Sequence, residues 1–151
     1  MALDLEAVKA AEIPETSMTL ERGRLVAFAR AIGERDPVYL DAQAARAAGH
    51  PDIPAPPTFL FALETESPFP FDQADRLGFD PALVLHGQQS FSYDRLAYAG
   101  DVLTCRSRIV DAYAKTPAMD FVVKRSEIRR GDGERVLVAE TLLIFRSAVA
   151  A

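Results

Sequence analysis

Residues 31–41 concentrate the side chains of this chain that could perform acid–base chemistry. The segment contains the phenol of Tyr39 and three carboxylates, Glu34, Asp36 and Asp41, around one glycine and one proline. A carboxylate that is held in a cleft can have a raised pKa and act as a general acid or base. The alternative is a solvated cluster that caps helices, and Asp41 in particular suits a helix N-cap. For Glu34 the residues alone leave both interpretations open.

The two histidines and the single cysteine are the other reactive groups. His86 lies on a predicted strand, where a histidine is usually structural, although it could instead face a ligand pocket. For His50, on the loop before the predicted central helix, we expect a surface role. Cys105 has no metal-ligand spacing around it and is expected to be a small buried hydrophobe on a strand. The sequence therefore predicts no metal site.

Two helices are expected on either side of the acidic segment. The first begins at a Thr19 cap, ends at Gly33 and has an apolar stripe at helical spacing, formed by Leu25, Phe28, Ala29 and Ile32. The second runs from the Asp41 cap to Gly49. These two helices must position the carboxylates between them.

The remainder of the chain predicts one helix followed by antiparallel strands. Residues 58–65 are apolar on nearly all sides, which is typical of a central helix, and Pro57 suits its first position. Residues 66–81 are expected to form a loop with one helical turn. Strands are predicted at 83–93, 102–112, 118–130 and 135–147, with a hairpin signal at Gly131-Asp-Gly133. This order predicts a single α+β domain over residues 1–151, with a curved sheet around the helix and residues 1–16 as a lead-in.

Composition excludes several classes of function. Of the 151 residues, 49% are hydrophobic and 26% are charged, as in an ordinary globular domain. The net charge of −5 and a pI of about 5.0 argue against nucleic acid as a partner. No apolar run approaches the ~20 residues of a membrane helix, and the acidic N-terminus shows no export signal. We expect a cytoplasmic protein that does not bind membranes.

Residues 17–147 resemble the MaoC-like (R)-specific hydratase and dehydratase superfamily, which has the hot-dog fold. Its members hydrate trans-2-enoyl thioesters of CoA or acyl carrier protein, or run the reverse dehydration. Their loop reads like Ser-Gly-Asp-x-Asn-Pro-x-His-x-Asp, and Ala-His-Gly follows at the start of the central helix. The strand Leu85-His86-Gly87-Gln88-Gln89-Ser90-Phe91-Ser92-Tyr93 resembles Leu-His-Gly-Glu-Gln-x-Phe-x-Tyr of the FAS1-like, or MaoC N-terminal, dehydratase branch. The segment 96–104 resembles a second motif that indicates only the fold.

Three departures fall on the chemical elements of the family site. Glu34 stands at the position of the catalytic Asp, and a carboxylate misplaced by ~1 Å can cost about a hundredfold in rate. Tyr39 stands at the position of the His, and a phenol of pKa about 10 is a poor base at neutral pH. Pro57 stands at the position of the Gly whose amide helps to hold the thioester oxygen, and proline has no N–H. Loss of one such donor typically costs ~10²–10³ in rate. Asp36 stands at the position of the Asn.

The resemblance therefore implies a subunit that binds acyl thioesters of CoA or acyl carrier protein, with no other cofactor. A homodimer, or a heterodimer with a catalytic MaoC-like subunit, is expected. The residues that could take part in catalysis are Glu34, Tyr39 and His86. The residues expected at the substrate are Asp36, Ala55, Pro57, Thr58, Phe69, Phe71 and Phe79, although the three phenylalanines could equally form a satellite core under the loop.

Three alternatives remain open. One is a self-sufficient hydratase that uses Glu34, alone or together with His86, in a rebuilt site. Another is a hot-dog acyl-CoA thioesterase, in which Glu34 alone activates water against the thioester carbonyl. The third is a binding or scaffold protein, in which Glu34 could be replaced without effect.

Overall fold

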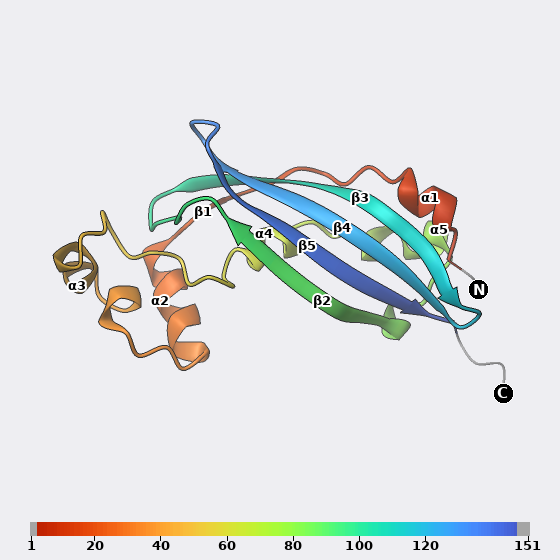
Figure 1. Ribbon diagram of the computed structural model, residues 1–151, viewed down its shortest axis with the longest axis horizontal. Helices are drawn as coiled ribbons and strands as arrows, with labels where there is room; N and C mark the ends of the chain where they lie inside the picture. Colours follow the sequence, from red (N-terminus) through yellow and green to blue (C-terminus); the bar gives the residue numbers. More distant parts are fainter. Residues whose placement is uncertain (1–2, 148–151) are drawn as a thin grey trace.

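The computed structural model describes residues 3–147 as one curved antiparallel sheet packed against a short central helix (Figure 1). The strands are β1 (Thr16–Thr19), β2 (Val84–Tyr93), β3 (Val102–Thr116), β4 (Met119–Arg130) and β5 (Arg135–Arg146), in the order β1-β3-β4-β5-β2. Every neighbouring pair is antiparallel. The α+β fold expected from the sequence is therefore confirmed, and β1 and β2 form the two edges of the sheet.

Alternation of buried and exposed side chains explains the long strands. On β4, Val122, Lys124, Ser126 and Ile128 are buried, whereas Arg125 between them is exposed. Successive side chains of a strand point to opposite faces, so these four face the helix. The β4–β5 hairpin turns where it was predicted, and Gly133 adopts the left-handed φ of +88° that the turn requires.

The central helix, α4 (Phe61–Thr65), is shorter than predicted. Pro57 was expected at its first position, but the helix begins four residues later, after tight turns in which Phe59 N donates to Pro56 O and Ala62 N donates to Phe59 O. These turns direct Phe59 and Leu60 into the core, where Leu60 is fully buried. The expectation of a regular helix from residue 58 was therefore wrong, although the segment does lie in the middle of the fold.

The N-terminal region also differs from the prediction. Residues 1–16 were expected to be a lead-in, but they contain α1 (Leu5–Lys9), whose Val8 is buried against the sheet. Thr19 is not a helix cap, because it pairs with Val102 as the last residue of β1. The following helix, α2 (Arg22–Ala31), begins after Glu21.

The predicted apolar stripe of α2 is correct except at its end. Leu25 and Ala29 are fully buried, and Phe28 packs against the core. Ile32 is 53% exposed, because the helix ends at Ala31 and the chain turns away at Gly33, which has a φ of +77°. Periodicity could not show where the helical spacing stops.

Helix α3 (Ala42–Ala47) follows an N-cap at Asp41, as predicted, and the Asp41 carboxylate accepts hydrogen bonds from the amides of Gln43 and Ala44. Asp52 joins this helix to α2. Its carboxylate accepts two hydrogen bonds from the Arg22 guanidinium, at 3.0 and 2.7 Å, and one from Arg46 at 3.0 Å. The Arg22 hydrogen bonds hold the pKa of Asp52 well below its usual range. The pairing fixes both helices that flank the acidic segment.

Residues 66–81 were expected to form a loop with one helical turn, but residues 66–83 contain more structure. They form the short helix α5 (Ala74–Leu77) between two 3-10 turns, at Phe71–Gln73 and Pro81–Leu83. Leu77 is fully buried and belongs to a second core cluster with Val8 of α1. Among the helices of residues 3–147, none has both the length and the apolar character needed to cross a membrane.

Candidate functional site

The acidic segment is organised by its own backbone. Glu34 Oε1 accepts hydrogen bonds from the amides of Arg35 at 2.7 Å and Asp36 at 2.9 Å. Asp36 accepts from the Val38 amide at 3.0 Å and so caps the 3-10 turn Pro37–Tyr39. With Asp41 as the cap of α3, all three carboxylates accept amide hydrogen bonds within the segment. Carboxylates used in this way shape a loop.

Tyr39 lies close to the carboxylates and to Tyr93 of β2. Burial raises the pKa of Tyr39, and the negative charges of Glu34 and Asp36 raise the pKa further. The deprotonated form of Tyr39 is therefore even less populated at neutral pH than that of a tyrosine free in water. Tyr39 can donate a hydrogen bond there but is a poor general base.

Tyr93 of β2 contacts the turn that precedes the central helix. The Tyr93 hydroxyl donates to the carbonyl oxygen of Pro57, and burial raises the pKa of Tyr93 to about 12. Pro57 and Thr58 are exposed, whereas Ala55 is buried and its amide donates to Ala97 O at 2.8 Å. Position 57 thus offers no N–H to an oxyanion.

A Tyr93→Phe variant should remove one late-titrating phenol and loosen the turn at Pro57. Since the folded pKa is raised above the unfolded value of about 10, the stability gained from this shift is present below pH ~10 and is lost as the pH rises toward 12. Ultraviolet titration of phenolate absorbance should show the last ionisation missing in the variant. Denaturant unfolding at neutral pH should show a loss of about 1 kcal/mol. A late ionisation that persists in the variant would contradict the assignment of the pKa of about 12 to Tyr93.

A cavity of about 370 Å³ lies beside α4 and the segment that follows it. Its apolar lining includes Phe61, Phe69, Phe71 and Leu143, so two of the three predicted phenylalanines line it. Phe69 is buried, whereas Phe71 is 53% exposed. Of the residues predicted at the thioester end, Asp36, Ala55, Pro57 and Thr58 are not in this lining.

Phe79 is the exception among the aromatic residues predicted at the substrate. It is buried in the second core cluster, with its ring edge-to-face at 4.8 Å from Phe145. The α5 helix turns the chain before Phe79, which therefore packs against the sheet and is not part of the cavity lining. The satellite-core alternative describes Phe79, whereas Phe69 belongs both to this cluster and to the cavity lining.

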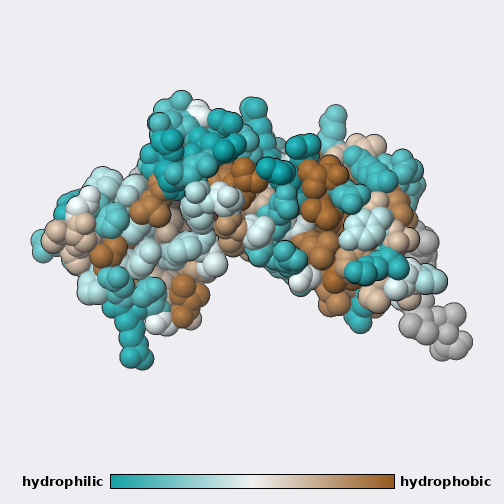
Figure 2. All heavy atoms as spheres, viewed as in Figure 1, coloured by the Kyte–Doolittle hydropathy of each residue, from teal (hydrophilic) through white to brown (hydrophobic). Residues whose placement is uncertain are grey.

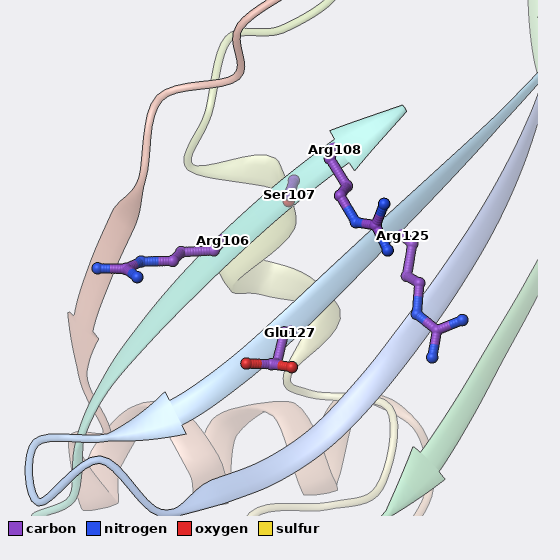
Figure 3. Close-up of a pocket in the computed structure, with 5 residues that line it drawn as sticks. All are labelled: Arg106, Ser107, Arg108, Arg125 and Glu127. Carbon is purple, nitrogen blue, oxygen red and sulfur yellow. The ribbon is translucent and has the colours of Figure 1, made fainter. Parts of the chain in front are cut away.

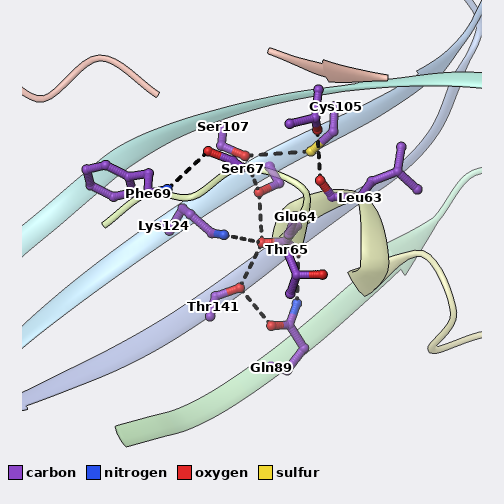
Figure 4. A network of polar contacts seen from close by, with 12 residues as sticks. Leu63, Glu64, Thr65, Ser67, Phe69, Gln89, Cys105, Ser107, Lys124 and Thr141 are labelled. Atoms are coloured by element: carbon purple, nitrogen blue, oxygen red, sulfur yellow. Dashed lines mark hydrogen bonds and ion pairs between the residues drawn. The ribbon is translucent and has the colours of Figure 1, made fainter. Parts of the chain in front are cut away.

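A buried polar network forms part of the cavity wall and was not predicted from the sequence (Figure 4). Glu64 of α4 is 3% exposed and forms a 2.9 Å ion pair with Lys124 of β4, which is 7% exposed. The Glu64 carboxylate also accepts from Ser126 at 3.0 Å and from Gln89 at 3.3 Å. Thr141 Oγ1 lies 3.1 Å from Glu64 Oε2 and 2.7 Å from Gln89 Oε1.

One signal for this network was present in the sequence. Lys124 occupies an inward position in the alternation Val122, Lys124, Ser126, Ile128, and Glu64 is the one acidic residue within the apolar run 58–65. A charge at an inward strand position needs a partner, because burying it alone is costly. The pattern could have identified Lys124, but not its partner.

His86 lies at the margin of this network. Its ring stacks on Phe61 at 5.2 Å, and its Nε2 lies 3.2 Å from Gln89 Oε1. Within residues 3–147 no hydrogen bond joins His86 to Glu34 or Tyr39. The structure thus places Glu34 and Tyr39 on the acidic loop and His86 on β2, outside the cavity lining.

The outer face of the sheet carries paired charges. Arg106, Arg108, Arg125 and Glu127 project from β3 and β4 around a hollow of about 210 Å³ (Figure 3). Arg106 pairs with Glu15, and Arg125 pairs with Glu140 at 3.3 Å. In the view of Figure 2, hydrophilic areas alternate with hydrophobic ones. Arg106, Arg108 and Arg125 are exposed, so the arrangement is a solvated charged face.

Comparisons with known proteins identify the family. The model of the FAS1-like, dehydratase domain region matches residues 7–139. A relative described as a UPF0336 protein, SCO4636 of Streptomyces coelicolor, is 39% identical over 148 residues, with 98% of each chain covered.

Solved structures show the same fold. A chain of the C-terminally truncated HadBC (3R-hydroxyacyl-ACP dehydratase) complex from Mycobacterium tuberculosis is 26% identical, with a TM-score of 0.75 over 88% of this chain and 96% of that one. A MaoC-like dehydratase is 21% identical, with a TM-score of 0.81 over 94% of this chain and 43% of that one. The fold is thus the hot-dog fold of the MaoC-like (R)-hydratases, and the chain belongs to the family of FAS1-like dehydratase domains.

Proposed function

We propose that this chain is the acyl-thioester-binding subunit of a paired hydratase or dehydratase, in which a MaoC-like partner supplies the Asp and His that activate water. The observation that carries the proposal is the state of the remnant site. Pro57 has no N–H, and Glu34 Oε1 is bonded to the amides of its own loop. Tyr39, at the position of the family His, has a raised pKa. The oxyanion donor is missing and a weaker base stands at the histidine position, so the family mechanism would need a partner's groups.

The cavity beside α4 supports the binding role. Its volume of about 370 Å³ is within the range of small-molecule sites, which are mostly apolar with a few polar groups. Phe61, Phe69 and Leu143 would contact the acyl chain, and Phe71 would cover it from the rim. Asp36, Ala55, Pro57 and Thr58 would border the thioester end, where the loop meets the turn before α4.

Strand β2 supports the pairing. It is ten residues long and lies at the edge of the sheet, with β5 as its neighbour on one side. A long exposed edge strand is a template for pairing with another chain. The related HadBC structure is a complex of dehydratase subunits. A partner of the same fold, docked along β2, would bring a second loop and a second helix to the site.

The test is to assay the purified chain alone on crotonyl-CoA and on longer enoyl-CoAs. Hydration and release of free CoA should both stay at the uncatalysed background, and Glu34→Ala should change neither. Hydration that Glu34→Ala abolishes would support the self-sufficient hydratase and overturn the proposal. Release of free CoA would favour the thioesterase.

A further inference from the structure

The cavity wall carries charge where an acyl chain would be expected to meet hydrocarbon. Glu64, Lys124 and Thr141 are buried and line the cavity together with Phe61, Phe69 and Leu143. A buried ion pair is costly to desolvate, and a cavity for plain hydrocarbon has no use for it. The pair therefore bears on which acyl chains fit.

Glu64 and Lys124 differ in how many of their hydrogen-bonding groups have partners. Both oxygens of Glu64 are occupied, Oε2 by Lys124, Ser126 and Thr141 and Oε1 by Gln89. Ser126 is itself fixed by Ser107, whose hydroxyl lies 2.8 Å away. The carboxylate thus has a complete set of donors and needs nothing from a ligand.

The ammonium group of Lys124 has donors to spare. It carries three N–H groups, and Glu64 is its one hydrogen-bond or ion-pair partner within residues 3–147. Because Lys124 lines the cavity, the remaining N–H groups are available to an acceptor inside it. A hydrocarbon chain packed against them would leave these donors without a partner, which is unfavourable.

The charges of Glu64 and Lys124 determine which kind of hydrogen-bond acceptor can bind beside Lys124 in the cavity. Glu64 and Lys124 neutralise each other, so a carboxylate tail would leave one net negative charge in an otherwise mostly apolar cavity. A neutral oxygen would satisfy the lysine without that cost. Glu64 follows Pro57 by seven residues, which corresponds to about 10–14 Å of helix or 3-10 turn. The oxygen would therefore lie in the distal part of the acyl chain, far from the carbons that react.

We propose that the cavity selects acyl thioesters with a neutral oxygen, a hydroxyl or keto group, in the distal part of the chain, and that Lys124 donates a hydrogen bond to this oxygen. The inference rests on the proposed acyl-thioester-binding function and specifies the acyl group. Lys124 acts here as a specificity residue, held in place by Glu64.

The test is calorimetric titration of the full chain with decanoyl-CoA and with hydroxydecanoyl-CoA isomers that carry the hydroxyl on each carbon of the distal half. At least one isomer should bind about tenfold or more tightly than decanoyl-CoA, since a hydrogen bond to a charged donor is gained. The CoA thioester of decanedioic acid, which ends in a carboxylate, should bind more weakly than that isomer. Equal affinity of decanoyl-CoA and all the isomers would overturn the inference.

Variants assign the preference to the pair. The double variant Glu64→Gln with Lys124→Met removes both charges while keeping the approximate shape, and it should bind decanoyl-CoA and the preferred isomer equally. Lys9→Met on α1 is the matched control and should keep the preference. A preference that persists in the double variant would overturn the role of Lys124. If no thioester binds the wild-type chain, the proposed function fails as well, whereas equal binding of all thioesters removes only this inference.

Discussion

A mixture of this chain with a hot-dog subunit that carries an intact Asp/His loop is expected to hydrate enoyl-CoAs at least about a hundredfold faster than the two subunits assayed separately. Acid–base catalysis by the partner can act only on a thioester that is held in the correct position. This chain offers the apolar cavity beside α4 but, at Pro57, no amide for the thioester oxygen. A hot-dog protein encoded beside this chain, with a Gly-Asp-x-Asn-Pro-x-His loop, is the first partner to try.

The rate is measured as loss of enoyl-thioester absorbance, and complex formation by co-elution on gel filtration. Glu34→Ala in this chain should leave the rate of the mixture within about twofold, because its carboxylate is bonded to its own loop. Replacing the Asp or His of the partner should return the rate to background. A mixture that is no faster than the sum of its parts would exclude the paired enzyme.

The second large effect is expected at the buried ion pair. Lys124→Met and Glu64→Gln, made singly, should each lower the free energy of unfolding by about 3–5 kcal/mol. Each single change leaves one buried group uncompensated, and in the lysine variant this is a carboxylate that is 3% exposed. Urea denaturation at neutral pH measures the loss.

The double variant provides the decisive comparison. With both charges removed, the cost of desolvation is also removed, so the double variant should lose much less stability than the sum of the single variants. Lys9→Met, whose ammonium group pairs with Glu6 on the surface, should change stability by less than about 1 kcal/mol. Additive losses in the double variant would mean that the two groups are not coupled.

Features that depend on residues close together in the sequence were predictable from the sequence. The β4–β5 hairpin, the cap at Asp41 and the burial of Leu25 follow from local patterns of polarity and turn residues, and the structure contains all three. The predicted start of α2 at Thr19 failed because Thr19 pairs with Val102, a residue distant in the chain. Phe79 was misplaced for a similar reason, since its ring packs against Phe145, another residue distant in the chain.

The sequence by itself determined that Pro57 cannot donate a hydrogen bond to an oxyanion, because the missing N–H is a covalent property of proline that no fold can restore. It also determined that a phenol stands at the histidine position of the family loop. Only the tertiary structure decided that Glu64 and Lys124, which are 60 residues apart, form a buried pair. Their contact exists because the curved sheet brings β4 over α4, and the same closure excludes water from both charges and places them in the wall of the cavity.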